Sequence, residues 1–561
     1  MRKQSFIMGS IILALGGVLA KGLGAFYKIP LTNILGTTGI GIYYLIFPIF
    51  SFVLTMSSSG VATALNIVVA KERKKHNRKN EFRYLKVALV IAFVISAIFM
   101  AFIMIFAKDI AYIQGNVNAT LSYMAIAPAV VISSQISVVR GYFQGVENMI
   151  PTTISMIIEQ IVKMCIGLIF AYITIPYGVE YAVLSAVMGV TASEIIALII
   201  IVINFVVYKK KLDANIILYR ENYILDYAKP LLKKKVSYLK TKQQKAYYKK
   251  RIYTYKEIVV DFLKLALPLT LTKLIAPLIL LVDSFVVINL FLNVGYSVNI
   301  ATSLYGISTG VVSTITGLTA VVTTSITTAI IPKINDSVSD KARLENISFI
   351  FKFVIMVGVV LGVGIFIGAD SIITILYGGA LNNVVIDEVG IAINLLTIAS
   401  ISIIYSGVIQ ISNIILQSIG KAMVAFVVTF ILALVRVLVL VILVYLGLNV
   451  YAMEIADVVF LGVSCILLVW QIKKVIGFSI STNFIVGAIT MFALGAMVGN
   501  IINELLQIWF NGFIATLISI GLVYMIYAIS LYYSNIFTIR EKEILFFRYK
   551  KKSITTKILQ K

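Results

Sequence analysis

Four basic side chains stand deep inside apolar segments of this sequence, namely Lys21, Lys163, Lys273 and Arg436. An ionised side chain at the centre of a membrane-spanning helix costs roughly 2.5–3.5 kcal/mol on insertion scales, so such residues are usually paired or functional. Lysine binds phosphate as a point charge, and arginine can bind it with two parallel hydrogen bonds. The four cations therefore predict either internal ion pairs or a cationic cavity for an anionic substrate.

Acidic residues at similar depth are fewer. Glu159 precedes Lys163 by four positions and shares its helix face, so an internal salt bridge is the first interpretation of this pair. Lys21 and Lys273 have no nearby acid on their own helices, which favours a role in a cavity. Further acidic candidates for pairing or for coupling to an ion are Asp283, Glu194, Glu454 and Asp457.

Metal, disulfide and triad chemistry have little support. The chain has one histidine, His76, in the polar run KERKKHNRK, and two cysteines, Cys165 and Cys465, each alone in an apolar run. There is no CxxC pair, no phosphate-binding glycine loop and no HExxH motif. We expect no metal site, no cofactor and no catalytic residues.

The composition is that of an all-α polytopic membrane protein. Of 561 residues, 60% are hydrophobic and 13% are charged, with a mean hydropathy of +1.00; soluble proteins average about 25% charged residues. The apolar runs reach about 20 residues or more, the length at which a helix crosses roughly 30 Å of hydrocarbon. They lack the alternation of a membrane β-barrel.

We expect about fourteen spans. The first is far longer than the apolar core of a signal peptide, about 7–15 residues, and is interpreted as an uncleaved span. The predicted spans lie near residues 6–34, 42–69, 84–107, 119–143, 151–174, 179–207, 257–288, 300–331, 347–368, 388–414, 421–446, 450–472, 482–502 and 510–533.

Lysine and arginine collect in alternate connections, including the Lys71–Lys86 and Lys333–Lys352 segments and the Lys473-Lys474 pair. The other connections hold almost none, apart from Lys28 and Lys108. By the positive-inside rule the basic connections and both termini face the cytoplasm of a bacterial cell membrane.

The two halves of the chain resemble each other. If Gln144 is placed over Gln417, Lys163 falls on Arg436, and a lysine stands early in each half. Six spans return the chain to its starting side, so the repeats are parallel, with a substrate site expected at their interface. The predicted division is a first lobe (1–207), a basic linker (208–256), a second lobe (257–472), two extra spans (473–533) and a basic tail (534–561).

The linker decides how the net charge of +24 is interpreted. Its lysines and tyrosines fit a cytoplasmic loop lying on anionic lipid, with the aromatic rings at the headgroups. A nucleic-acid surface also interleaves basic and aromatic residues, but attachment to the membrane makes nucleic acid an improbable partner.

Three segments resemble a known family: LAKGLGAFYKIPLTNILGTTGIGIYYLIFP (19–48), RGYFQGVENMIPTTISMIIEQIVK (140–163) and LALPLTLTKLIAPLILLVDS (265–284). They are similar to the polysaccharide-transport proteins of the MOP superfamily, in particular the stage V sporulation protein B / YtgP-like group related to lipid II flippases. The resemblance covers essentially the whole chain and is most specific at 140–163.

The resemblance implies two six-helix lobes with alternating access around a cationic cavity for an undecaprenyl-pyrophosphate-linked precursor. The two extra spans would form a groove for the lipid tail. The family's basic residues of spans 1 and 7 match Lys21, Lys28 and Lys273, although relatives often carry arginine there. The MurJ-type arginine of span 8 has no counterpart in 300–331, so substrate detail does not transfer from that branch.

The leading hypothesis is an outward flippase for a lipid-linked oligosaccharide or peptidoglycan precursor, with Lys21, Lys28, Lys163, Lys273 and Arg436 as binding residues. A coupling ion or the membrane potential is a candidate source of energy, and no cofactor is expected. The alternative is an exporter of the related MATE type, but exporters of organic cations need acidic or aromatic cavities. A membrane-bound glycan polymerase or ligase is a third hypothesis. Such an enzyme would need catalytic groups in its connections, and the connections here are too short to supply them.

Overall fold

The computed structural model describes residues 6–75, 77–228, 253–323, 340–381, 386–419, 421–478 and 480–533. These residues form helices and their connections, with no strand among them. The predicted all-α class is confirmed. His76, residues 229–252 of the predicted linker and the predicted tail (534–561) lie outside the described residues.

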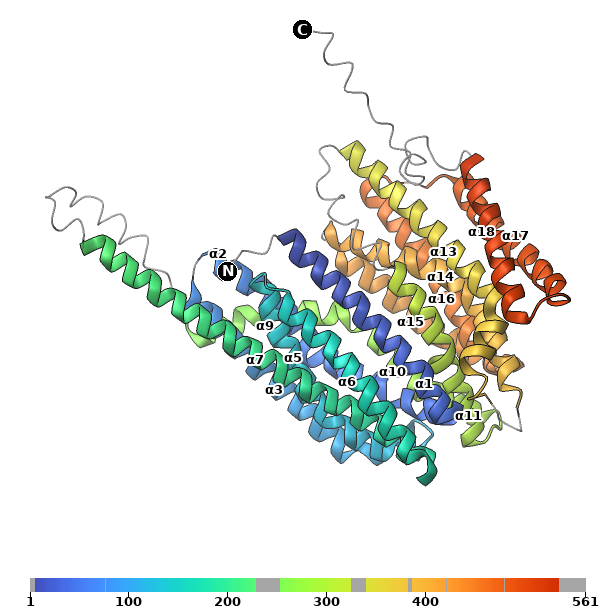
Figure 1. Cartoon of the computed structure of the whole chain (residues 1–561), viewed down its shortest axis with the longest axis horizontal. Helices are drawn as coiled ribbons and strands as arrows, with labels where there is room; N and C mark the ends of the chain where they lie inside the picture. Colours follow the sequence, from blue (N-terminus) through green and yellow to red (C-terminus); the bar gives the residue numbers. More distant parts are fainter. Residues whose placement is uncertain are drawn as a thin grey trace, which may run out of the picture. The chain divides into compact units, whose positions relative to one another are not determined.

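The helices form two compact units, each described by itself below (Figure 1). The first unit contains the chain up to Thr314 together with Val444–Asn449. Its elements are α1 (Phe6–Leu54), the π-helical turn η1 (Thr55–Ser59), α2 (Gly60–Lys74), α3 (Arg78–Ile105), α4 (Ala107–Ile113), η2 (Val117–Ala119), α5 (Thr120–Gly145), α6 (Ile150–Thr174), η3 (Ile175–Tyr177), α7 (Val179–Ala228), α9 (Tyr255–Lys273), α10 (Ile275–Asn293), α11 (Val298–Gly306) and the π-helical turns η5 (Ile307–Val312) and η6 (Val444–Leu448).

The second unit contains Ile315–Leu443 and the chain from Val450 onward. Its helices are α13 (Asp340–Tyr377), α14 (Glu388–Ser418), α15 (Ala422–Leu443), α16 (Tyr451–Ile476), α17 (Thr482–Gln507) and α18 (Gly512–Tyr533). The hairpin of α17 and α18 packs on α13 (Figure 1). Tyr524 of α18 ties it there by donating its hydroxyl hydrogen to the Val360 carbonyl, 2.8 Å away.

Thirteen helices within the described residues are long and apolar enough to cross a membrane. The first covers Ile12–Lys74, and 63 residues are too many for one crossing at about 1.5 Å per residue. It is interrupted at Gly36, whose φ of 68° and ψ of 179° are open to glycine and strongly disfavoured for other residues. The sequence placed the connection between its first two spans at this position. The total of fourteen spans stays a prediction.

Helix starts follow the capping residues in the sequence. The Thr254 side chain accepts a hydrogen bond from the Glu257 backbone N–H, while the Glu257 carboxylate accepts one from the Thr254 backbone, a capping box that begins α9. The Asn77 side chain caps α3 in a similar way. Both starts lie at the same end of the first unit, because Asn80 of α3 accepts a hydrogen bond from the Tyr253 backbone N–H.

The core of the first unit lies between α2, α3, α5 and α9. Tyr84 of α3 packs against Phe262 of α9, with ring centroids 6.3 Å apart, and both side chains are buried. The sequence analysis assigned residues from 257 onward to the second lobe, whereas α9, α10 and α11 contact the helices of the first unit. Contact between helices does not decide which repeat they belong to, so the proposed lobe boundaries stay a prediction.

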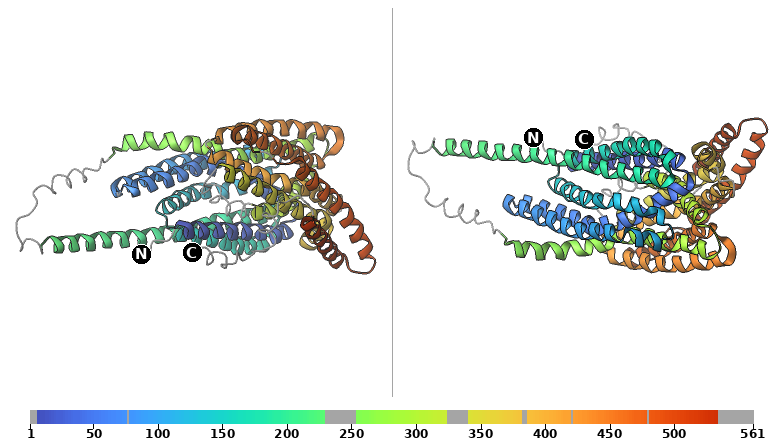
Figure 2. Two further views of the ribbon diagram at one scale, coloured as in Figure 1. Left: turned by 90° about the horizontal axis from the view of Figure 1, so that it is seen from above. Right: turned by 90° about the horizontal axis from the view of Figure 1, so that it is seen from below.

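The helix α7 continues well past its predicted span, which was placed at 179–207. It runs to Ala228 and projects beyond its neighbours in the first unit (Figure 2). The first part of the predicted linker is therefore helical. Its sequence, YKKKLDANIILYREN, is polar, which fits a helix that leaves the hydrocarbon.

Candidate functional site: cations of the helices and an apolar pocket

Lys273 is placed where the seventh predicted span breaks. Helix α9 ends at Lys273 and α10 begins at Ile275. The Lys273 ammonium donates to the Ser59 carbonyl oxygen at 3.2 Å and to the Thr63 hydroxyl oxygen at 2.5 Å. Both acceptors are neutral, so the charge of Lys273 is solvated by hydrogen bonds but not cancelled.

Lys28 and Lys21 lie on α1. The Lys28 ammonium stands 5.1 Å from the centroid of the Tyr44 ring, a cation–π contact. Tyr44 is held in turn by its hydroxyl, which lies 3.5 Å from the Thr314 hydroxyl. Lys21 is exposed. Among the described residues, no carboxylate lies within salt-bridge distance of Lys21, Lys28 or Lys273.

Lys163 has a different environment. Its ammonium lies 5.6 Å from the centroid of the buried Tyr27 ring. Glu159 and Glu194 are both near enough to act on it electrostatically, and Glu194 itself is buried. Lys163 therefore has acidic groups in its neighbourhood.

The salt bridge of Glu159 differs from the expected one. Its carboxylate pairs with Arg140 of α5, at 2.8 Å between Nη2 and Oε2, and not with Lys163. Arg140 also donates from Nε to the Ser155 hydroxyl oxygen at 2.9 Å. Sequence reasoning missed this pair because the spacing rule for one helix cannot see a partner on the preceding helix. The signal was present, since Arg140 begins the segment that carries the most specific part of the resemblance.

The same kind of pairing occurs in the second unit. Arg436 of α15 forms a hydrogen-bonded ion pair with Asp457 of α16. Arg436 is buried, so the loss of Asp457 would leave an uncompensated charge inside the protein. In each unit a cation on one helix thus meets an acid on the helix that follows it. The part of Arg436, Lys163 and these acids in binding or coupling stays a prediction, as does that of Asp283, which is buried on α10.

A polar cluster closes the end of the first unit where α2 and α3 meet. The buried Glu72 carboxylate accepts hydrogen bonds from the Lys75 ammonium at 2.8 Å and from the Asn80 amide at 3.3 Å. The hydrogen bond to Glu72 raises the pKa of Lys75, because it stabilises the charged ammonium. Asn80 also binds Tyr253, so the cluster fixes the entry to α9.

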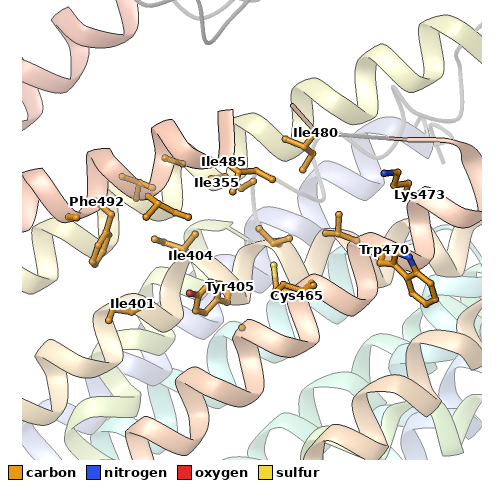
Figure 3. Close-up of a pocket in the computed structure, with 18 of the residues that line it drawn as sticks. Ile355, Ile401, Ile404, Tyr405, Cys465, Trp470, Lys473, Ile480, Ile485 and Phe492 are labelled. Atoms are coloured by element: carbon orange, nitrogen blue, oxygen red, sulfur yellow. The ribbon is translucent and has the colours of Figure 1, made fainter. Parts of the chain in front are cut away.

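An apolar pocket of about 580 Å³ lies in the second unit (Figure 3). It is lined by α13, α14, α16 and α17, and by none of the residues of α18. Lys473 and Trp470 lie at one end, and Ile401 and Phe492 lie at the other. The resemblance predicted a groove made by the two extra spans. This pocket uses the first of them, α17, together with α13, α14 and α16.

The comparison that decides the family comes from its sequence profile. The profile of the polysaccharide biosynthesis proteins matches residues 6–337, more than half of the chain. The chain belongs to this family. Among the relatives of this polysaccharide biosynthesis protein is stage V sporulation protein B of Bacillus subtilis (strain 168), 26% identical over 385 residues, which make up 68% of each chain. The lipid II flippase MurJ of the same organism is 24% identical over 202 residues, 33% of this chain and 37% of that protein.

Solved structures show the same fold. The lipid II flippase MurJ in an inward closed conformation superposes with a TM-score of 0.65 at 14% identity, covering 93% of this chain and 99% of MurJ. An inward-facing multidrug resistance MATE transporter of the MOP superfamily gives a TM-score of 0.59 at 16% identity, covering 81% and 94%. The chain is thus a membrane flippase or transporter of the MOP type and not an enzyme.

Proposed function

We propose that this protein moves an undecaprenyl-pyrophosphate-linked oligosaccharide or peptidoglycan precursor from the inner to the outer leaflet of a bacterial cell membrane. One observation carries the proposal. Lys21, Lys28 and Lys273 keep uncompensated positive charge inside apolar helices, whereas Lys163 and Arg436 have acidic neighbours. Three such charges are costly in hydrocarbon, and a diphosphate would neutralise them.

The lipid part of the substrate needs an apolar surface, because its long isoprenoid chain loses free energy wherever it meets water. The pocket beside α17 provides such a surface, with Lys473 at one end. In this proposal the pocket takes part of the tail. The saccharide and diphosphate, which cannot cross hydrocarbon without replacing their water, are carried by the cationic residues of α1 and α9.

The test is transport by the purified full-length protein in liposomes. A labelled undecaprenyl-pyrophosphate saccharide is placed in one leaflet, and the appearance of its headgroup in the other leaflet is timed. Lys273→Ala is expected to slow transport at least tenfold, because it removes an uncompensated charge. Lys108→Ala is the matched control: it removes an exposed lysine of α4 from the same unit and is expected to leave the rate unchanged. Equal rates in wild type and Lys273→Ala would overturn the assignment.

A MATE-type exporter is the second candidate, since the MATE transporter above shares the fold. Its substrate class would be an organic cation, and the removal of Lys273 would then speed uptake or leave it unchanged. Counterflow of a fluorescent organic cation in the same liposomes separates the two functions.

A further inference from the structure

The acceptors of Lys273 belong to an irregular turn of the second predicted span. Ser59 is the last residue of the π-helical turn η1, and Thr63 lies one turn further along in α2. The Ser59 carbonyl accepts from the Thr63 hydroxyl at 2.9 Å as well as from Lys273. A π-helical turn shifts the register of the backbone hydrogen bonds, and such turns are frequent at functional sites.

The turn recurs in the second repeat. Lys273 lies 252 positions after Lys21, and Ile307, which begins η5, lies 252 positions after Thr55, which begins η1. Each repeat therefore carries a π-helical turn at the same distance from its deep lysine. A shared local distortion that survives the divergence of the two repeats is typical of a built feature rather than an accident of packing.

Close packing holds Lys273 against this turn. A Cβ atom added to Gly60 would lie 2.6 Å from the Thr270 backbone nitrogen and 2.6 Å from the Ala266 carbonyl oxygen. Only a glycine lets α2 and α9 approach this closely. The approach puts Lys273, one turn beyond Thr270, within reach of Ser59 and Thr63.

We propose that the Ser59 carbonyl and the Thr63 hydroxyl form a dock for the Lys273 ammonium, which the ammonium leaves when a diphosphate binds. This rests on the proposed function. The two acceptors of the dock are neutral, whereas a phosphate oxygen is negatively charged, so the ammonium gains a charge–charge attraction when it moves to the anion. Thr63 is thereby a positioning residue, which sets the affinity for the anion without touching it.

The dock also links binding of the diphosphate to the conformation of the helices. Lys273 stands at the break between α9 and α10, and its partners stand at the π-helical turn between α1 and α2. When the ammonium leaves, the break between α9 and α10 therefore loses its hydrogen bonds to the π-helical turn η1 and to α2. Irregular turns of this kind are where long helices bend.

The experiment measures binding of a short-chain polyprenyl diphosphate to the full-length protein in nanodiscs, together with transport in liposomes. Thr63→Val keeps the shape of the side chain and removes the acceptor. It is expected to bind the diphosphate about fivefold more tightly, the factor that corresponds to the net free energy of one ordinary hydrogen bond. It is also expected to transport the saccharide more slowly. Thr63→Ser restores the acceptor and is expected to match wild type.

The matched control is Thr429→Val. Thr429 donates only to the Ala425 carbonyl of its own helix, at 2.8 Å, and lies in the second unit. It is expected to change neither affinity nor transport. If wild type binds the diphosphate and Thr63→Val binds it equally well, the dock is wrong and the proposed function stands.

Hydrogen exchange gives a readout that needs no ligand. Lys273→Met is expected to speed exchange at least tenfold in the backbone of residues 55–63, because the carbonyl dock loses its ammonium. Unchanged exchange there also overturns the dock. If wild type binds no diphosphate, the proposed function fails. The proposed movement of the Lys273 ammonium from the dock to a diphosphate fails with it.

Discussion

The Arg140 guanidinium and the Glu159 carboxylate form an ion pair, at 2.8 Å, across the turn that joins α5 to α6. Each side chain is 16% exposed, so the pair is well shielded from water. Glu147 in the turn adopts a positive φ of 61° where the chain reverses between α5 and α6. The pair therefore fixes the helix that carries Lys163.

Arg140→Ala is expected to destabilise the protein by about 3–5 kcal/mol, because it removes the charged partner of the shielded Glu159 carboxylate and leaves it the neutral Gln160 amide. Chemical unfolding in detergent measures the loss. The double variant Arg140→Ala, Glu159→Gln is the control and should recover much of it, since no unpaired charge remains. A double variant as unstable as the single one would show that packing, not charge, holds the turn.

The sequence predicted the class of the fold and the residues to examine, because long apolar runs and rare deep charges are strong signals. The partners of those charged residues were harder to predict. The rule for positions four apart pointed Glu159 to Lys163, while the structure brings Arg140 from the neighbouring helix. Spacing along one helix is local, whereas a cross-helix partner depends on the turn and on packing.

The breaks within helices were also not predicted from the sequence. The connection predicted between the first two spans contains Gly36, but nothing in TMSSS (55–59) marks a π-helical turn, because such a turn depends on the neighbours that satisfy its carbonyls. The break after Lys273 likewise falls between two apolar stretches of ordinary helical composition. Proline at position 277 lies four residues beyond Lys273 and is a local hint.

Tyr44 positions Lys28 through its ring and not through its hydroxyl. Tyr44→Leu removes the cation–π contact, which is worth about 0.5–2 kcal/mol, and is expected to lower diphosphate affinity about three- to tenfold. Tyr44→Phe keeps the ring and is expected to bind nearly as wild type. Titration calorimetry in nanodiscs compares them. If Tyr44→Phe is as weak as Tyr44→Leu, the contact between the Tyr44 and Thr314 hydroxyls matters instead.

Gly60 and Gly17 form a matched pair of helical glycines. Gly60→Ala places a methyl group against the α9 backbone, so α2 and α9 must separate, and we expect a loss of about 1–3 kcal/mol in stability together with slower transport. Gly17→Ala meets nothing within 4 Å and gains helix propensity, so stability should hold or rise by about 1 kcal/mol. Thermal unfolding and transport rates measure both. Equal behaviour of the two variants would contradict the close approach of α2 and α9.

Gly462→Leu tests the pocket beside α17. A Cβ atom at this position lies 3.5 Å from the Tyr405 ring, an ordinary contact, and the rest of the leucine side chain would fill part of the apolar space. We expect transport of an undecaprenyl-linked saccharide to fall about tenfold, while a short-chain analogue, whose tail needs less of the pocket, keeps its rate. Gly521→Leu on α18 is the control, because a side chain there enters open space. If transport of both substrates slows to the same degree, the substitution disturbs the packing of the helices rather than binding of the lipid tail. The pocket would then have no part in selecting the length of that tail.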